Sequence, residues 1–262
     1  MKVLWLGMDD TLGCTWHWHE LRLYLRDHYD VDLAGPGYSW EYGIGQVLAS
    51  SIGMDDYDVV VLDDCNAMGY VPIAWDIRPK AKLAWREHDW HNKQRQQIAA
   101  ALKPDKILGC YKRRAVREWS DPFGSDPNWS YVPHAVNTER FNPGPDPRKY
   151  KYGMYGMVAN CYPGRAAARQ ELRGRKDSWL PVHGGYWMDG RGSNKQTYYN
   201  DKLADALRDV TALWVSPGQG GGMLLKYFEG AASGCLLVGV RPEGFILPEL
   251  GFVDLGDELL CL

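Results

Sequence analysis

Short apolar runs alternate with amphipathic segments along the first 140 residues. "KVLWLG" (2–7) and "YDVVVLDD" (57–64) predict buried strands, and "WHWHELRLYLRDH" (16–28) predicts a helix. This alternation predicts a parallel sheet with helical crossovers. The same patterns predict further strands at 30–36, 80–90, 104–111 and 129–136, and further helices at 42–53, 92–103 and 112–120.

The segment "NPGPDPRKYKYG" (142–153) is rich in proline, glycine and charge, and is the best linker candidate. Beyond it the alternation restarts, so we expect two doubly wound α/β domains, 1–143 and 144–262. In such sheets ligands bind at the carboxyl ends of strands, which places the expected site in the cleft between the domains. The second domain has predicted strands at 152–159, 179–187, 211–217 and 235–240, and predicted helices at 164–174, 194–210 and 221–233.

Composition and charge narrow the function classes. The net charge of −3 and the pI of about 6.2 give no global attraction to nucleic acid or to anionic membranes. Because a strand is predicted already at residues 2–7, we expect no signal peptide, and no apolar run reaches about 18 residues. We therefore expect a cytoplasmic protein. The six cysteines show no zinc-like spacing and are expected to be reduced core thiols.

The stretch "SPGQGGGMLLKYFEG" (216–230) carries the clearest candidate chemistry. Gly220, Gly221 and Gly222 precede a predicted helix, whose free N–H groups and dipole suit a diphosphate. Lys226 reaches toward the same place, and Glu229 shares its helix face at i+3. A carboxylate there suits the two hydroxyls of a ribose. The alternative is an ordinary glycine-rich loop followed by a surface ion pair.

Three motifs resemble the GT-B glycosyltransferases, in particular the group 1 family and its spore-maturation (CgeB-like) relatives. The motifs are "GGGMLLKYFEGAASGCLLVG" (220–239), "YVPHAVNTERFNP" (131–143) and, more weakly, "YGMYGMVANCYPGRAAARQEL" (152–172). The resemblance implies a GT-B fold, in which two Rossmann-like domains face each other across a cleft. The sequence ends at "GFVDLGDELLCL" (251–262), where family members usually continue with further helices, and this predicts a minimal or truncated enzyme.

The resemblance also implies an activity. The enzyme would move a sugar from a UDP- or GDP-sugar to a hydroxyl group, without a metal or another cofactor. It would act on a glycan or a small molecule. Glu229 would hold the ribose, while Lys226 and the turn at 220–222 would face the diphosphate. Arg165 and His134, from the other two motifs, would be further donor-site residues. Many retaining members have a second Glu where this chain has Gly221, so the stereochemical outcome stays open.

A catalytic base would come from the strand ends of the first domain. The candidates are Asp89 and His88 in "REHDWH", then Asp64 and Asp10. The alternative for each is a helix N-cap or a surface side chain. His17 and His19 in "WHWHE" lie two apart and would point away from each other on a helix, so they do not predict a metal site.

Three other functions remain open from the sequence. The first is a phage-type glycosyltransferase that acts on modified DNA bases. Such an enzyme needs basic residues that follow a phosphate backbone, and this chain has a basic run, although such runs are usually solvated helix faces. The second is a nucleotide-sugar-binding protein without catalysis. A sugar-nucleotide epimerase of related fold is a further possibility. The basic run comprises Lys112, Arg113, Arg114 and Arg117.

Overall fold

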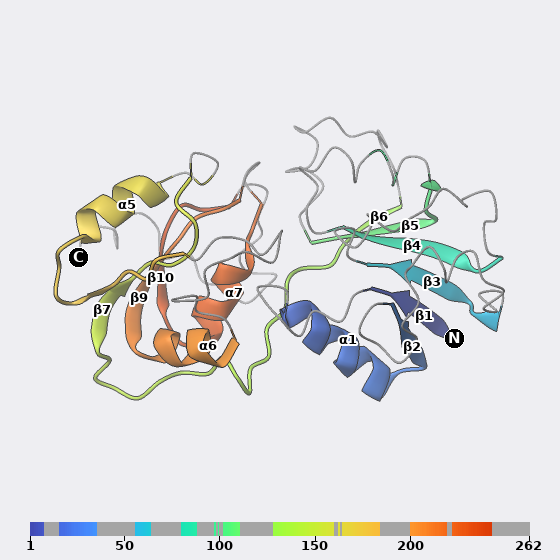
Figure 1. The fold of residues 1–262 in the computed structure, drawn as a ribbon, viewed down its shortest axis with the longest axis horizontal. Coiled ribbons are helices and arrows are strands. Elements are labelled where there is room, and N and C mark those ends of the chain that lie inside the picture. The colour runs from blue at the N-terminus through green and yellow to red at the C-terminus, as the bar shows by residue number, and fades with distance from the viewer. Residues whose placement is uncertain are drawn as a thin grey trace. The chain divides into compact units, whose positions relative to one another are not determined.

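The computed structural model describes residues 1–7, 16–35, 56–63, 80–87, 97, 99, 102–110, 128–159, 162, 164–183, 200–218 and 222–242. The chain divides into two compact units, Met1–Pro133 and His134–Leu262, and each is described here by itself (Figure 1).

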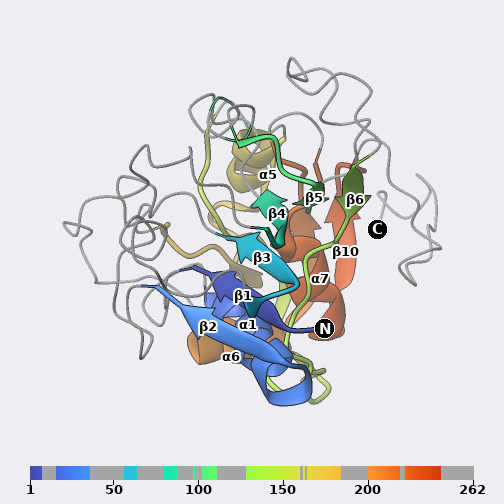
Figure 2. The same cartoon turned by 90° about the vertical axis from the view of Figure 1, so that its right-hand side faces the viewer.

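The first unit is built on a parallel sheet with the strand order β2-β1-β3-β4-β5-β6 (Figure 2). Helix α1 (Trp16–His28) packs Leu23 and Leu25 against an apolar cluster that includes Trp5 and Val61 on one sheet face. The predicted α/β architecture is thus confirmed for this half. The strands are β1 (Val3–Leu6), β2 (Val31–Ala34), β3 (Val59–Leu62), β4 (Lys82–Glu87), β5 (Lys106–Gly109) and β6 (Trp129–Tyr131).

The second unit contains a smaller parallel sheet with the strand order β10-β9-β7-β8. Its buried core includes Leu207 on a helix, Leu213 in the sheet and Tyr227 on a second helix, each at most 4% exposed. The strands are β7 (Tyr150–Gly153), β8 (Ser178–Trp179), β9 (Val210–Val215) and β10 (Leu236–Gly239), and the helices are α5 (Arg165–Leu172), α6 (Asn200–Arg208) and α7 (Leu225–Ala232).

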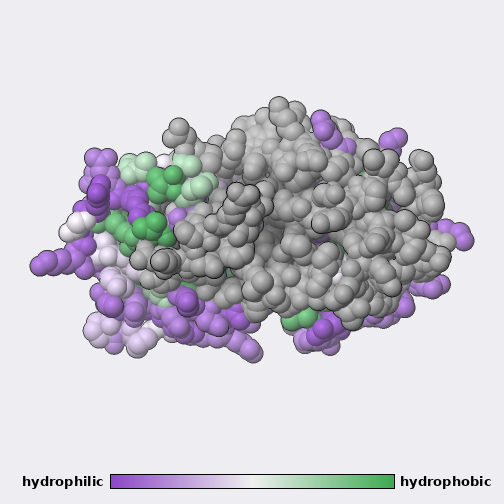
Figure 3. All heavy atoms as spheres, in the orientation of Figure 1, coloured by the Kyte–Doolittle hydropathy of each residue, from purple (hydrophilic) through white to green (hydrophobic). Residues whose placement is uncertain are grey.

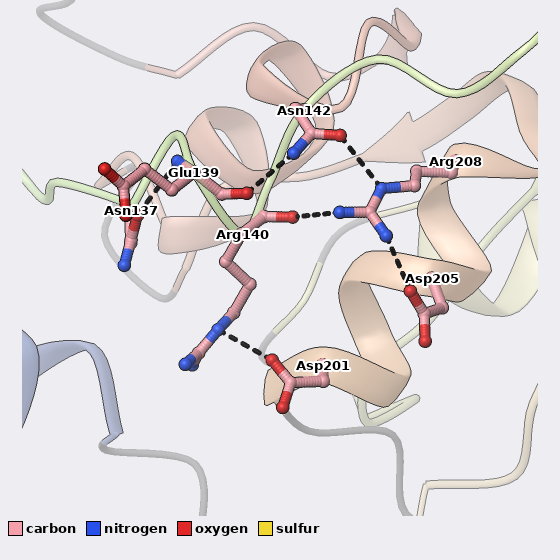
Figure 4. Close-up of polar contacts among 7 residues, drawn as sticks. All are labelled: Asn137, Glu139, Arg140, Asn142, Asp201, Asp205 and Arg208. Atoms are coloured by element: carbon pink, nitrogen blue, oxygen red, sulfur yellow. Dashed lines mark hydrogen bonds and ion pairs between the residues drawn. The ribbon is translucent and has the colours of Figure 1, made fainter.

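The stretch that precedes the predicted linker packs on the second unit. Phe141 is 6% exposed and belongs to that unit's core. Arg208 on α6 donates to the Asn142 side chain (3.0 Å) and to the Arg140 carbonyl (2.7 Å), as Figure 4 shows. These contacts join residues 140–142 to α6, in the unit that begins at His134.

The described surface is mostly hydrophilic on the face drawn in Figure 3, with small apolar areas. Exposed large apolar side chains include Val158, Val182 and Leu236. Among the helices that the structure describes, none is long and apolar enough to cross a membrane.

Candidate functional site

The carboxyl ends of β7 and β9 meet the start of α7 in the second unit. Because these strands are parallel, the residues that follow them lie at one edge of the sheet. Tyr155 and Gly156 follow β7, and Ser216 follows β9. This edge brings together residues that are up to 74 positions apart, from Tyr155 to Glu229, and it holds the candidate site.

Two cations converge on Gly156. A Cβ built on Gly156 would lie 2.5 Å from Cε and 3.0 Å from Nζ of Lys226, and 3.2 Å from a terminal guanidinium nitrogen (Nη1) of Arg165. Gly156 has a positive φ of +103°, which side chains rarely tolerate. Glycine at this position therefore lets the backbone pass directly beneath the two charged groups.

Arg165 is held in place from three sides. It is 2% exposed, its Nε donates to the Ser216 hydroxyl at 2.8 Å, and Nη1 donates to the Met157 carbonyl at 2.8 Å. Its guanidinium lies 3.8 Å from the centre of the Tyr162 ring. Arg165 is the first residue of α5, and its guanidinium lies beside the residues that follow β7 and β9. A buried and fixed guanidinium is suited to binding an anion with little loss of entropy.

Glu229 is buried on α7 with 7% of its surface exposed, and its carboxylate accepts a hydrogen bond from the Tyr155 hydroxyl. Burial raises the pKa of Glu229, although Lys226 and Tyr155 act in the opposite direction. Burial and the Glu229 charge also raise the pKa of Tyr155 well above its usual value. The alternative of a surface ion pair is therefore wrong, because Glu229 is not at the surface.

His183 is a third basic group at this edge, and the sequence did not single it out. It lies four residues after β8 and is partly exposed. Burial lowers its pKa, and the charges of Lys226 and Arg165 lower it further. In the sequence, His183 stands inside the strand predicted at 179–187, directly after the apolar residues "WLPV".

The helix predicted to begin at Gly221 begins later. Helix α7 starts at Leu225 without a side-chain cap, and its N-cap residue Leu224 is extended. Gly222 is buried three residues before the helix, and its carbonyl accepts from the Gly218 N–H at 2.8 Å. Lys226 is thus the second helical residue, close to the positive end of the helix dipole. Gly220 and Gly221 lie outside the described residues.

His134 is buried at the start of the second unit, with 8% exposure. Its ring meets the Phe228 ring of α7 edge-on, at 6.3 Å between centroids. The structure thus places His134 against the helix that carries Lys226 and Glu229, and its predicted contact with the donor stays a prediction.

Two strand-end carboxylates of the first unit have structural partners. Asp63 is 1% exposed, and its Oδ2 accepts from Trp5 (2.9 Å), Arg22 (3.1 Å) and Arg86 (3.1 Å). Glu87 is also 1% exposed and accepts from the Trp85 indole N–H at 2.9 Å. Residues so enclosed are poor candidates for a base that must reach an acceptor.

The predicted catalytic and DNA-binding residues lie outside the described residues, so the structure places none of them. Within the described part of the chain, no group of three His, Cys, Asp or Glu side chains is arranged to hold a metal ion. The catalytic candidates are Asp10, Asp64, His88 and Asp89, and the basic run is Lys112, Arg113, Arg114 and Arg117.

Comparisons with known proteins were informative at the level of the fold. No protein-family model and no curated protein sequence matches the chain. The structure of Anabaena HepE in complex with UDP and glucose matches this chain with a TM-score of 0.58 and 11% sequence identity. The match covers 93% of this chain and 82% of the HepE chain. The structure of TarM matches with a TM-score of 0.42 and 13% sequence identity, and the match covers 72% of this chain and 42% of the TarM chain. The likeness to HepE shows the fold alone, and with it the α/β fold built on parallel sheets that the sequence predicted is confirmed.

Proposed function

We propose that the chain transfers a sugar from a nucleoside-diphosphate sugar, UDP- or GDP-linked, to a hydroxyl group of an acceptor. The observation that carries this proposal is the convergence of Lys226 and Arg165 over Gly156, beside the buried Glu229. Cations next to a carboxylate match a ligand that has a diphosphate at one end and a ribose diol at the other.

The two cations provide the electrostatic part of the chemistry. When the sugar–phosphate bond breaks, negative charge builds on the departing diphosphate, and fixed positive groups stabilise that charge without reorganising. Arg165 is fixed by Ser216 and Met157, and Lys226 lies at the uncapped start of α7. In this proposal the two side chains and the helix dipole take the part that a metal ion plays in other transferases, so activity should persist in EDTA.

Glu229 is proposed to bind the ribose. Tyr155 donates to its Oε2, and within the described part of the chain no second donor reaches the carboxylate. Oε1 thus keeps its acceptor capacity for a ligand hydroxyl. A buried carboxylate with an open oxygen favours a polar ligand, because an ionised group without a full set of partners is costly.

HepE supports the donor class by analogy. Its structure holds UDP and glucose, and its fold extends over nearly the whole of this chain. At 11% identity the analogy concerns the scaffold, while the residues of this chain carry the chemical argument. The acceptor is proposed to be a glycan or a small hydroxylated molecule, deprotonated by Asp89 or His88, or else by Asp64 or Asp10.

A panel of labelled UDP- and GDP-sugars tests the proposal, with EDTA present and acceptors offered separately. Wild type should release or transfer the label. Lys226→Met should weaken UDP binding about 10- to 100-fold, since a charged hydrogen bond is lost. Lys202→Met, which removes an exposed lysine of α6, should leave UDP binding unchanged. Stable binding with neither transfer nor hydrolysis would contradict the proposal and favour a non-catalytic binding protein.

A further inference from the structure

Tyr155 contacts both halves of the proposed donor site, and the sequence assigned it no role. It follows β7 and is 7% exposed. Its hydroxyl donates to Glu229, and the Lys226 ammonium lies 4.4 Å from the centre of its ring. The Trp179 ring packs against it at 5.9 Å between centroids, which restricts its movement.

We propose that Tyr155 is a positioning residue of the donor site, with its hydroxyl orienting Glu229 toward the ribose and its ring holding Lys226 toward the diphosphate. This inference rests on the function proposed above. It adds a specific device, in which one rigid side chain sets the spacing between the ribose-binding group and the phosphate-binding group.

The hydroxyl acts on Glu229 in two ways. A glutamate side chain has three rotatable bonds, and the hydrogen bond to Oε2 selects one arrangement in which Oε1 remains open. The same bond stabilises the charged carboxylate, which accepts two ligand hydroxyls better than the protonated acid does. Without it, the buried carboxylate would lose its donor and adopt other rotamers.

The ring acts on Lys226 independently of the hydroxyl. A cation over an aromatic face is attracted by the ring, and the attraction corresponds to roughly two- to thirtyfold in an equilibrium constant. Lys226 also lies so close to Gly156 that a Cβ added there would be 3.0 Å from its Nζ. The Tyr155 ring and the Gly156 backbone therefore confine the ammonium from two sides. The two contributions of Tyr155 can be separated by substitution, since phenylalanine keeps the ring and leucine keeps neither group.

The experiment measures dissociation constants for three probes by calorimetry: UDP, 2′,3′-dideoxy-UDP and inorganic pyrophosphate. Wild type should prefer UDP to the dideoxy compound. Tyr155→Phe should weaken UDP binding about tenfold. It should also reduce the ratio of the dideoxy-UDP and UDP dissociation constants, and it should leave the affinity for pyrophosphate unchanged. Tyr155→Leu should weaken pyrophosphate binding as well, because the ring beneath Lys226 is gone.

Tyr227→Phe is the matched control. Tyr227 is also buried in the second unit, with 4% exposure, and its hydroxyl donates to the Val240 carbonyl at 2.6 Å. Its loss should reduce thermal stability without changing the ratio of the UDP and dideoxy-UDP constants. The comparison thus separates loss of any buried hydroxyl from loss of the one at Glu229.

Two results would overturn the inference while leaving the proposed function intact. One is a Tyr155→Phe variant with the wild-type preference for UDP over its dideoxy analogue. The other is an equal loss of affinity for all three probes, which indicates a general structural role. If the wild type binds none of the probes, the proposed function fails, and the inference fails with it.

Discussion

Replacing Gly156 with alanine is the sharpest test of the cation site. The new Cβ would lie 2.5 Å from Cε of Lys226, whereas carbon atoms in ordinary contact are about 3.5 Å or more apart. The lysine must therefore retreat by about 1 Å (3.5 − 2.5). Arg165 is also crowded, at 3.2 Å, but it is held by its bonds to Ser216 and Met157. Lys226 thus takes most of the displacement.

A retreat of this size is enough to break a contact with a phosphate. A hydrogen bond of about 2.8 Å would lengthen to about 3.8 Å, beyond the range in which it has appreciable strength. Losing a charged hydrogen bond costs about 1.5–3 kcal/mol, which corresponds to a 10- to 100-fold rise in Kd. Alanine at the positive φ adds a folding cost of about 1–3 kcal/mol.

The assay is calorimetric titration with UDP, paired with thermal unfolding. Gly174→Ala is the control, because Gly174 has a similar positive φ of +83° but no atom within 4 Å of the added Cβ. Both variants should lose stability, and only Gly156→Ala should lose affinity. A folded Gly156→Ala protein that binds UDP as tightly as wild type would refute the reasoning that Lys226 binds the diphosphate.

Three further substitutions test the second unit. Burial raises the pKa of Glu229 above 4.5, so the folded chain binds the Glu229 proton more tightly than the unfolded chain does. Glu229→Gln should therefore raise Tm at pH 7, by an amount that shrinks as the pH falls toward 4.5. The same substitution should lower the affinity for UDP. Arg208→Ala should lower the free energy of unfolding by about 1–2 kcal/mol and speed amide exchange near Asn142, measured by mass spectrometry. Gly230→Ala should destabilise by about 1–3 kcal/mol in denaturant titration despite its better helix propensity, because its Cβ would lie 2.6 Å from Leu213 Cδ2.

Local patterns predicted the elements of the fold well where burial and periodicity agree. Helix α1 spans 16–28 as expected, because its pattern is amphipathic over its whole length. The strand predicted at 152–159 instead runs over Tyr150–Gly153, and the apolar residues after it enter the site. Its limits follow from pairing with β9, where Tyr150 lies opposite Val210. That register is a long-range property, which the sequence pattern does not contain.

The candidate site was predictable only in part, for a related reason. Glu229 and Lys226 stand in one short motif, so their proximity follows from helical spacing. Tyr155 and His183 follow β7 and β8, and they matter because they lie near Lys226 or Glu229 of α7. Nothing near either residue in the sequence indicates that proximity. The sequence did not indicate that α7 starts at Leu225, because no capping residue stands between the glycine turn and the first helical residues.

Three locally unfavourable features coincide at this one edge of the second unit. Glu229 is a buried carboxylate whose charged form burial opposes, Gly156 has a backbone conformation that only glycine adopts easily, and Lys226 and Arg165 bring two positive charges together. Such costs gather where function requires them rather than where packing does. A ligand that brings a diphosphate to the cations and a diol to the carboxylate would offset the charge costs together. An apolar ligand would offset neither cost, and an isolated phosphate would offset only the repulsion between the cations. The pairing of Glu229 with the cations therefore fits the proposed nucleoside-diphosphate ligand better than either.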